Sequence, residues 1–177
     1  AGEDAVCAML EYGEHGGGHG HPDKLQLILY GLGQVLCPDL GTTGYGVPLH
    51  REWYKTTASH NTITIGTGKQ RATTGKLLGF RKEAAYSAAA AESTGAYPDW
   101  RLRRHLLLTD GFLVDIFAVQ GKAPDTVDWF LRAGGTATTP LALAPDAGKP
   151  RLVQFDGGMV IRSEGNGAGC HGLPAIL

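Results

Sequence analysis

The chain has 177 residues, with 16 Lys and Arg against 17 Asp and Glu, and 42% of its residues are hydrophobic. This length suits one compact domain with its own core, so we expect residues 1–177 to form a single domain. The near-neutral charge argues against a protein that binds nucleic acid mainly by neutralising phosphates. No apolar run approaches the roughly 20 residues of a membrane-spanning helix, so we expect no membrane partner either.

The N-terminal half begins with a mostly apolar segment, Ala5–Tyr12, which shows little periodicity. Residues 13–21 form a loop rich in glycine and histidine, which predicts a close approach of its backbone to another group. Leu25–Tyr30 and Gln34–Cys37 read as two strands, and the glycines between them predict a tight hairpin. A long polar and aromatic connection, Leu40–Ser59, follows.

The rest of the chain reads as short strands separated by turn residues. The alternation of Asn61–Ile65 predicts the first of them, and Asp110-Gly111 gives the clearest hairpin signal. Helix propensity is an alternative for Ala84–Ala91, but its neighbours on both sides favour a strand. The other predicted strands are Lys76–Arg81, Trp100–Thr109, Gly111–Val119, Thr126–Arg132, Arg151–Phe155 and Met159–Arg162.

This pattern predicts an all-β fold, an antiparallel β-sandwich without the alternating helices of a parallel sheet. The 27 glycines are spread along the whole chain, as tight turns require. The final stretch, Ser163–Leu177, shows no closing element, so we expect the natural chain to continue. The three cysteines, Cys7, Cys37 and Cys170, are an odd number at wide spacings, so we expect no disulfide framework.

Five residues stand out as candidate metal ligands: His15, His19, His21, Asp39 and His60. Imidazole nitrogen and carboxylate oxygen both bind zinc, and ligands from separate segments leave a coordination position for water. On spacing alone this pattern is weak, because histidines in a polar loop and a histidine that ends a strand would look the same. Metal binding and ordinary loop chemistry both stay open on these residues.

Three motifs resemble the heparinase II/III-like family, including its alginate lyase relatives. They are Tyr12–Leu25 (YGEHGGGHGHPDKL), Pro38–Thr42 (PDLGT) and Arg51–Thr62 (REWYKTTASHNT). Beyond Asn61 the resemblance is looser and rests on segments such as Asp99–Arg104. The resemblance implies a polysaccharide lyase with an N-terminal helical (α/α) toroid and a C-terminal, supersandwich-like β-sandwich. This chain matches the second part, so we expect a fragment that lacks the helical domain.

The resemblance also implies a zinc site. In such relatives zinc is held by the second histidine of His-Gly-His, by an aspartate after a strand and by the histidine before Asn-Thr. The matching residues in this chain are His21, Asp39 and His60. Two imidazoles and one carboxylate suit zinc better than calcium or magnesium, which prefer oxygen ligands. We expect this zinc to be mainly structural.

Catalytic candidates follow from the same resemblance. His19 matches a histidine that faces the substrate cleft, and Tyr45 or Tyr54 matches a tyrosine that contacts substrate. Arg51 and Lys24 suit an anionic sugar, and His15 is a further cleft candidate. Packing against Trp53 is the alternative for the tyrosines, and an ion pair with Glu52, Asp23 or Glu14 is the alternative for Arg51 and Lys24.

The reaction implied is β-elimination on a uronic-acid polysaccharide. Such a lyase neutralises the uronate carboxylate, removes the C5 proton and protonates the departing O4. In relatives the principal groups for these steps lie on the helical part, so we expect this chain alone to turn over little or no substrate. The resemblance implies a periplasmic or secreted protein, although no signal peptide is visible in this chain.

Two other functions remain open at this stage. The first is a non-catalytic carbohydrate-binding sandwich, in which Trp53, Trp100 and Trp129 would be exposed platforms for sugar rings. The second is a cupin-like metal enzyme, which uses His-x-His and a later histidine to hold a redox metal. A cupin normally carries a glutamate soon after His-x-His, whereas Pro22–Lys24 follows here.

Overall fold

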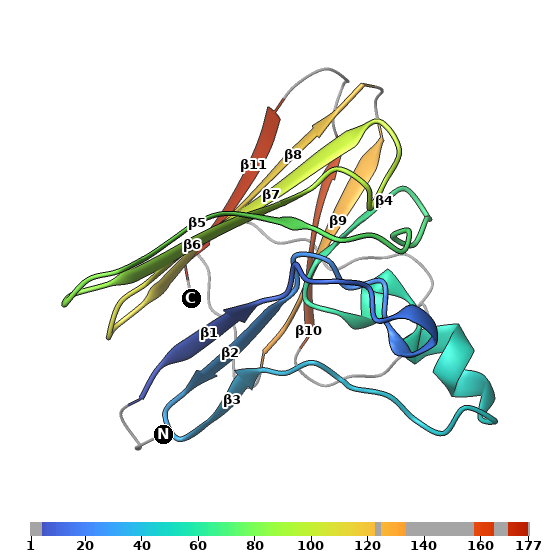
Figure 1. Ribbon diagram of the computed structural model, residues 1–177, viewed down its shortest axis with the longest axis horizontal. Helices are drawn as coiled ribbons and strands as arrows, with labels where there is room; N and C mark the ends of the chain where they lie inside the picture. Colours follow the sequence, from blue (N-terminus) through green and yellow to red (C-terminus); the bar gives the residue numbers. More distant parts are fainter. Residues whose placement is uncertain (1–4, 123–124, 134–157, 165–169, 177) are drawn as a thin grey trace.

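The computed structural model describes residues 5–122, 125–133, 158–164 and 170–176 (Figure 1). The described strands are β1 Cys7–Leu10, β2 Leu27–Gly31, β3 Gln34–Cys37, β4 Ile63–Ile65, β5 Lys76–Lys82, β6 Ser87–Ser93, β7 Trp100–Leu108, β8 Leu113–Gly121, β9 Thr126–Arg132, β10 Gly158–Glu164 and β11 Cys170–Ile176. Three short helical turns accompany them: η1 Gly17–His19, η2 His50–Tyr54 and η3 Thr57–Ser59. No helix in the described part of the chain is long and apolar enough to span a membrane.

The strands form three antiparallel sheets. A five-stranded sheet has the order β11-β8-β7-β6-β5, and it lies opposite two three-stranded sheets with the orders β1-β2-β3 and β10-β9-β4 (Figure 1). Each of the two smaller sheets shares a hydrophobic cluster with the larger one. The result is the antiparallel β-sandwich that the sequence predicts.

Most of the predicted strands are confirmed within two or three residues of their expected ends. The run 84–91 contains most of β6, so the choice of strand over helix is correct. The Gly31–Gly33 turn joins β2 to β3, and Leu32 and Gly33 both have positive φ, as a two-residue hairpin turn requires. The turn at Asp110-Gly111 joins β7 to β8.

Three features depart from the sequence predictions. The apolar segment 5–12 contains β1, whose neighbour across the sheet is β2. The C-terminal stretch was expected to lack a closing element, yet Cys170–Ile176 is an edge strand paired with β8. The long connection 40–59 holds two helical turns, η2 and η3. The predicted strand Arg151–Phe155 lies outside the described residues.

Alternation along β7 and β8 builds the interior of the sandwich. Leu102, Arg104 and Leu106 on β7 point inward, and the residues between them are more exposed. On β8 the same alternation buries Leu113, Asp115, Phe117 and Val119. One inward position on each strand therefore carries a charged side chain inside an otherwise apolar face.

Arg104 and Asp115 form a fully buried ion pair. The Arg104 Nε and Nη2 atoms donate to the two Asp115 carboxylate oxygens at 2.9 and 2.5 Å. Arg104 Nη1 donates to the carbonyl oxygens of Leu25 and Asn61 at 2.7 and 2.6 Å. The guanidinium carbon also lies 5.7 Å from the Trp129 ring centroid. These contacts satisfy a charge that would otherwise be costly to bury.

The tryptophans do not form a row of exposed sugar platforms. Trp129 is 1% exposed and belongs to the core, which rules it out as a stacking surface. Trp100 is half-buried and packs against that core, and Trp53 lies under the guanidinium of Arg132 at 5.3 Å from its ring centroid. The three-tryptophan form of the sugar-binding alternative is therefore wrong.

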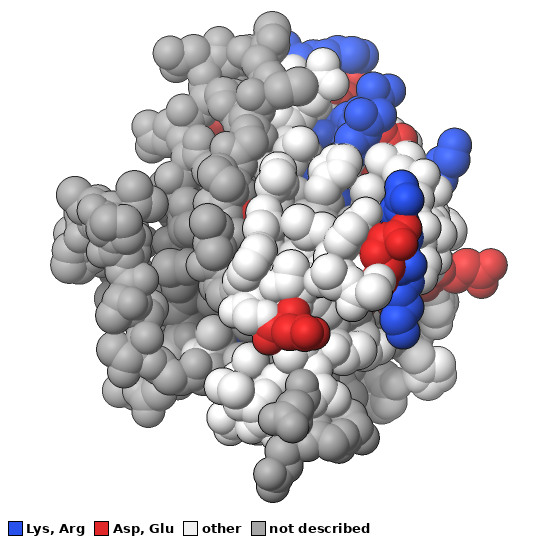
Figure 2. Space-filling model, turned by 90° about the vertical axis from the view of Figure 1, so that its left-hand side faces the viewer, with Lys and Arg blue, Asp and Glu red and all other residues white. Residues whose placement is uncertain are grey.

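Figure 2 shows one side face of the molecule. On the described part of this face, Lys, Arg, Asp and Glu side chains lie mainly toward the rim, and uncharged side chains cover the middle. Positive and negative groups stand beside one another along that rim. This view shows no broad field of a single sign.

Asp115→Ala removes one partner of the buried pair and leaves the Arg104 charge uncompensated. We expect the free energy of unfolding to fall by about 3–5 kcal/mol, measured by urea denaturation. The control is Glu83→Ala, because Glu83 pairs with Arg81 at 2.6 Å on the exposed surface. That variant should keep the wild-type midpoint. Equal effects of the two variants would contradict a structural role for the buried pair.

Candidate functional site

The loop of residues 13–21 is held in place from two sides. Gly16 and Gly17 have φ of 77° and 62°, a backbone conformation that favours glycine. A Cβ atom at Gly20 would overlap the carbonyl oxygen of His15. The Lys55 ammonium donates to the carbonyl oxygens of Gly18 and Gly20 at 2.9 and 2.6 Å. The loop therefore has one conformation that sets the positions of its histidines.

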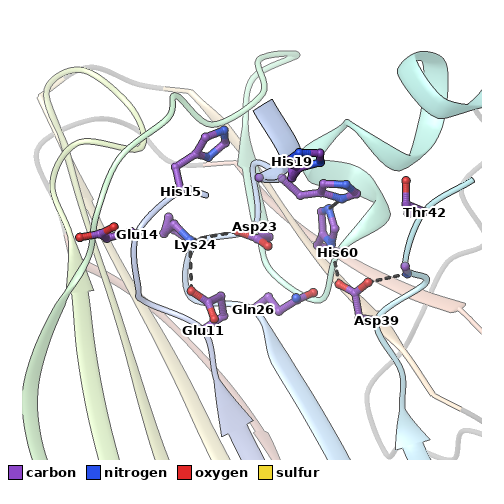
Figure 3. Close-up of a pocket in the computed structure, with 13 residues that line it drawn as sticks. Glu11, Glu14, His15, His19, Asp23, Lys24, Gln26, Asp39, Thr42 and His60 are labelled. Carbon is purple, nitrogen blue, oxygen red and sulfur yellow. Dashed lines mark hydrogen bonds and ion pairs between the residues drawn. The ribbon is translucent and has the colours of Figure 1, made fainter. Parts of the chain in front are cut away.

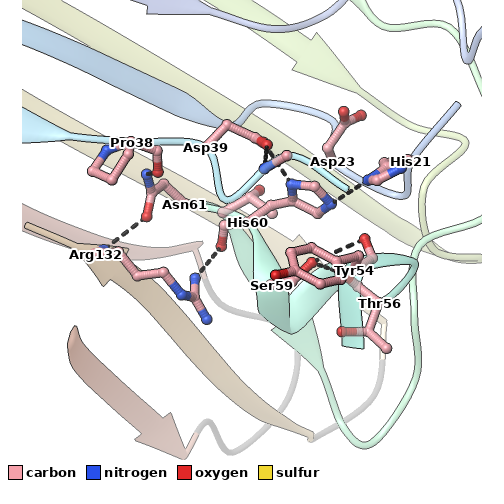
Figure 4. A network of polar contacts seen from close by, with 12 residues as sticks. His21, Asp23, Pro38, Asp39, Tyr54, Thr56, Ser59, His60, Asn61 and Arg132 are labelled. Atoms are coloured by element: carbon pink, nitrogen blue, oxygen red, sulfur yellow. Dashed lines mark hydrogen bonds and ion pairs between the residues drawn. The ribbon is translucent and has the colours of Figure 1, made fainter. Parts of the chain in front are cut away.

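His21, Asp39 and His60 meet beside this loop (Figure 4). The Nδ1 atom of His21 lies 3.3 Å from the Nε2 atom of His60. The Nδ1 atom of His60 lies 2.8 Å from Asp39 Oδ2, and the Gly41 N–H donates to Asp39 Oδ1 at 2.5 Å. Three segments that are distant in sequence thus bring the predicted metal ligands together.

Asp39 fixes the tautomer of His60. Burial raises the pKa of this carboxyl, but hydrogen bonds and charge from His60, with further hydrogen bonds from Gly41 and Gln26, outweigh that effect and lower the pKa to about 2. An ionised carboxylate only accepts hydrogen bonds, so the Nδ1 atom of His60 must carry the proton. When His60 is neutral, this tautomer leaves its Nε2 lone pair facing His21.

The two imidazoles have a spacing that suits a shared cation. Two nitrogen ligands of one tetrahedral zinc, each roughly 2.0–2.1 Å from the metal, lie roughly 3.3–3.4 Å apart. Burial, then the charges of His60 and Lys55, lower the pKa of His21 and favour its neutral form. However, Asp39 contacts the far nitrogen of His60, and no group of three or more His, Cys, Asp or Glu within the described residues is arranged to hold a metal. Zinc ligation by these three residues stays a prediction.

His19 and Tyr45 lie close together beside the same cluster. The His19 Nδ1 atom is 2.5 Å from the Tyr45 hydroxyl, and Tyr45 is 60% exposed. The Tyr45 ring also contacts His50, at 4.8 Å between centroids. Because both members of the first pair are exposed, a large ligand could reach their shared hydrogen bond.

His50 is a site residue that the sequence analysis missed. It is buried at the start of η2, its Nδ1 atom lies 3.1 Å from Thr42 Oγ1, and its ring lies 6.5 Å from that of His21. Arg132 was also missed as a support: its guanidinium donates to the backbone carbonyls of His60 and Ala58. Neither residue belongs to a motif, so the chain carried no local signal for them.

A pocket of about 400 Å³ opens beside these groups (Figure 3). Six predicted site residues line it: His15, His19, His21, Lys24, Asp39 and His60. Tyr45, Tyr54 and Arg51 are not among its lining residues. Arg51 is exposed on η2, and the backbone carbonyl of Tyr54 on the same turn accepts a hydrogen bond from Ser59.

Lys24 and Asn61 have structural partners. Lys24 is 2% exposed, and its ammonium lies 3.1 Å from Asp23 and 3.2 Å from Glu11. The ion pair that competed with a substrate role for Lys24 is therefore present. Asn61 donates to the backbone carbonyls of Leu27 and Pro38, so it satisfies backbone groups near the candidate metal site.

Comparison with known proteins gives one family over nearly the whole chain. The C-terminal family of heparinase II/III-like proteins matches residues 1–170. An exo-oligoalginate lyase from Saccharophagus degradans is 25% identical over 151 residues, which are 72% of this chain and 20% of that protein. The chain therefore spans about a fifth of that relative's length.

Solved structures show the same fold. Heparan sulfate lyase HepC from Pedobacter heparinus matches with a TM-score of 0.76 and 18% identity, over 97% of this chain and 32% of that one. A heparinase III structure matches with a TM-score of 0.62 and 24% identity, over 72% of this chain and 21% of that one. At these identities the likeness establishes the fold of the sandwich.

Gly20→Ala tests the packing of the loop. The new Cβ would overlap the His15 carbonyl, so we expect a loss of roughly 2 kcal/mol or more in the free energy of unfolding, measured by urea denaturation. The matched control is Gly18→Ala two residues earlier, where nothing lies within 4 Å of the added atom. A Gly20 variant as stable as the Gly18 variant would show that the loop is not packed in this way.

Proposed function

Because the chain belongs to the heparinase II/III-like C-terminal family, we propose that it is the sandwich part of a polysaccharide lyase that cleaves uronic-acid polysaccharides by β-elimination. The observation that carries this proposal is the hydrogen-bonded pair of His19 and Tyr45 beside the His21 and His60 cluster. The activities named for two relatives, an alginate lyase and a heparan sulfate lyase, support the substrate class. Both of those polymers contain uronic acids.

The His19 and Tyr45 pair has the chemistry that β-elimination needs. One group must take the C5 proton and another must deliver a proton to O4, and imidazole and phenol can each do either. Their 2.5 Å contact lets a proton pass between them. Tyr45 is exposed beside a histidine that lines the pocket, so we propose it, and not Tyr54, as the tyrosine that contacts substrate.

The positive charge that would bind an anionic sugar lies outside the pocket. The Lys24 ammonium already lies between two carboxylates, so it is a poor ligand for a third. Arg51 is exposed on η2, four residues before Lys55. Its guanidinium can form two parallel hydrogen bonds to a carboxylate or a sulfate, and we propose it as the residue that contacts the uronate.

We also propose that His21, Asp39 and His60 form a zinc site. Support comes from the donor types, the 3.3 Å spacing of the two nitrogens and the Asp39 contact that leaves the Nε2 lone pair of His60 toward His21. Bound zinc would supply a link between the loop 13–21 and the segment that ends at His60. This role is structural, because it would fix His19 two residues before His21.

Metal analysis tests the zinc site. We expect the purified chain to bind about one equivalent of zinc, and His21→Ala and His60→Ala each to abolish stoichiometric binding. Asp39→Ala should weaken zinc affinity by roughly 10- to 100-fold or more, as loss of an orienting or ligating carboxylate does. His105→Ala is the control, since His105 is exposed on β7 in the five-stranded sheet. Equal zinc content in all four variants would contradict the site.

Oligosaccharide binding tests the roles of the tyrosines. We expect Tyr45→Phe to weaken binding of a mannuronic acid trisaccharide by roughly fivefold, because the hydroxyl next to His19 is lost. Tyr54→Phe is the matched control and should bind as the wild type does, measured by calorimetric titration. We expect the wild-type chain alone to release little unsaturated product from alginate or heparan sulfate. Rapid turnover, or a larger effect of Tyr54→Phe, would contradict these assignments.

A further inference from the structure

The pocket beside the histidine cluster has an excess of negative charge. Four carboxylates line it, from Glu11, Glu14, Asp23 and Asp39, whereas Lys24 supplies the one ammonium among the lining residues. That ammonium is 2% exposed and is bound by Glu11 and Asp23. The nearby Lys55 ammonium is bound by two backbone carbonyls. The four carboxylates outnumber the one ammonium by three, and a zinc ion at the proposed site would still leave one negative charge in excess, so a carboxylate or sulfate entering this pocket would meet net repulsion.

One buried polar atom in the pocket wall lacks a partner. Gln26 is 5% exposed, and its side-chain oxygen Oε1 makes no hydrogen bond within the described part of the chain. The atom left without a partner is a carbonyl oxygen, which accepts hydrogen bonds and therefore needs a donor from a ligand.

Figure 3 places the Gln26 amide between Glu11 and Asp39 among the residues that line the pocket. An unsatisfied buried carbonyl is unfavourable unless a donor reaches it, so this position favours a ligand with a donor. His15 Nδ1 is a second buried lining atom without a partner among the described residues. Its tautomer can adapt to either a donor or an acceptor.

From these contacts we infer that the pocket binds the hydroxyl-bearing, uncharged part of a sugar, with one hydroxyl donating to Gln26 Oε1. A sugar hydroxyl is both donor and acceptor, so neighbouring hydroxyls can satisfy Gln26 and His15 together. The inference rests on the proposed function for its substrate class. It adds that the carboxylate of the bound unit points away from this pocket.

Gln26→Met tests the contact, because methionine has a similar length without the acceptor. The probes are a mannuronic acid trisaccharide and the neutral mannose trisaccharide of the same linkage, titrated calorimetrically into the full chain. We expect the variant to lose roughly five- to tenfold in affinity for both probes. A further set of trisaccharides, each lacking one hydroxyl, allows a double-mutant cycle between Gln26 and the sugar. Removal of the hydroxyl that contacts Gln26 should weaken binding to the wild type but not to the variant. That pattern separates a direct contact from a disturbed Asp39.

Glu14→Gln tests the charge argument. Glu14 is exposed and lines the pocket, so its neutral variant should keep the fold. We expect it to raise the affinity for the acidic trisaccharide severalfold while leaving the neutral one unchanged.

The outcomes separate the two proposals. If neither trisaccharide binds, the proposed function fails and this inference fails with it. If both bind but Gln26→Met matches wild type, or if no hydroxyl couples to Gln26, only the inference is overturned. If Gln26→Met loses affinity for the acidic trisaccharide alone, the inference is overturned in favour of a pocket that binds the uronate carboxylate. Calcium binding that Gln26→Met abolishes would overturn it in favour of a cation site.

Discussion

The buried guanidinium of Arg104 is the interaction on which the rest of the arrangement depends. One edge of the group is paired with Asp115 on the neighbouring strand, and Nη1 binds the carbonyls of Leu25 and Asn61. Those two carbonyls lie directly after Lys24 and His60 in sequence. A single side chain in the sandwich interior thereby fixes the spacing between two segments that carry the site.

A second set of polar contacts fixes the segments that carry the candidate zinc ligands. Asn61 bridges the carbonyls of Leu27 and Pro38, so the segment that carries His60 is fixed against β2 and the end of β3. Arg132 holds the His60 carbonyl from β9. His60 is therefore fixed through its backbone before its ring contacts His21 and Asp39. A site that is already ordered in this way loses less conformational entropy when it binds a ligand.

Periodicity and turn chemistry were sufficient to predict most of the strands, because strands such as β7 and β8 alternate clearly and the turn between them uses Asp-Gly. They failed at β1 and β11. The β1 segment Cys7–Leu10 is apolar at every position, so its sequence shows no alternation of polar and apolar residues although its exposure alternates. The β11 segment contains Gly172 and Pro174, which are depleted in strands. Pairing with a neighbouring strand, which is not visible locally, stabilises both.

The site divides in a similar way. Motif resemblance singled out His19, His21, Asp39 and His60, which the structure places around one pocket. It did not identify His50, Gln26 or Arg132. Their roles become visible only in the structure, from their burial and their hydrogen bonds or lack of them. Lys24 shows the opposite error, since a basic residue in a motif looks available until its carboxylate partners are located.

Lys55 couples two parts of the site mechanically. Its ammonium holds two carbonyls of the histidine loop while its own backbone follows η2, the turn that carries His50 and Arg51. The position of His19 in the loop is therefore linked to the position of this turn by two hydrogen bonds from one lysine side chain.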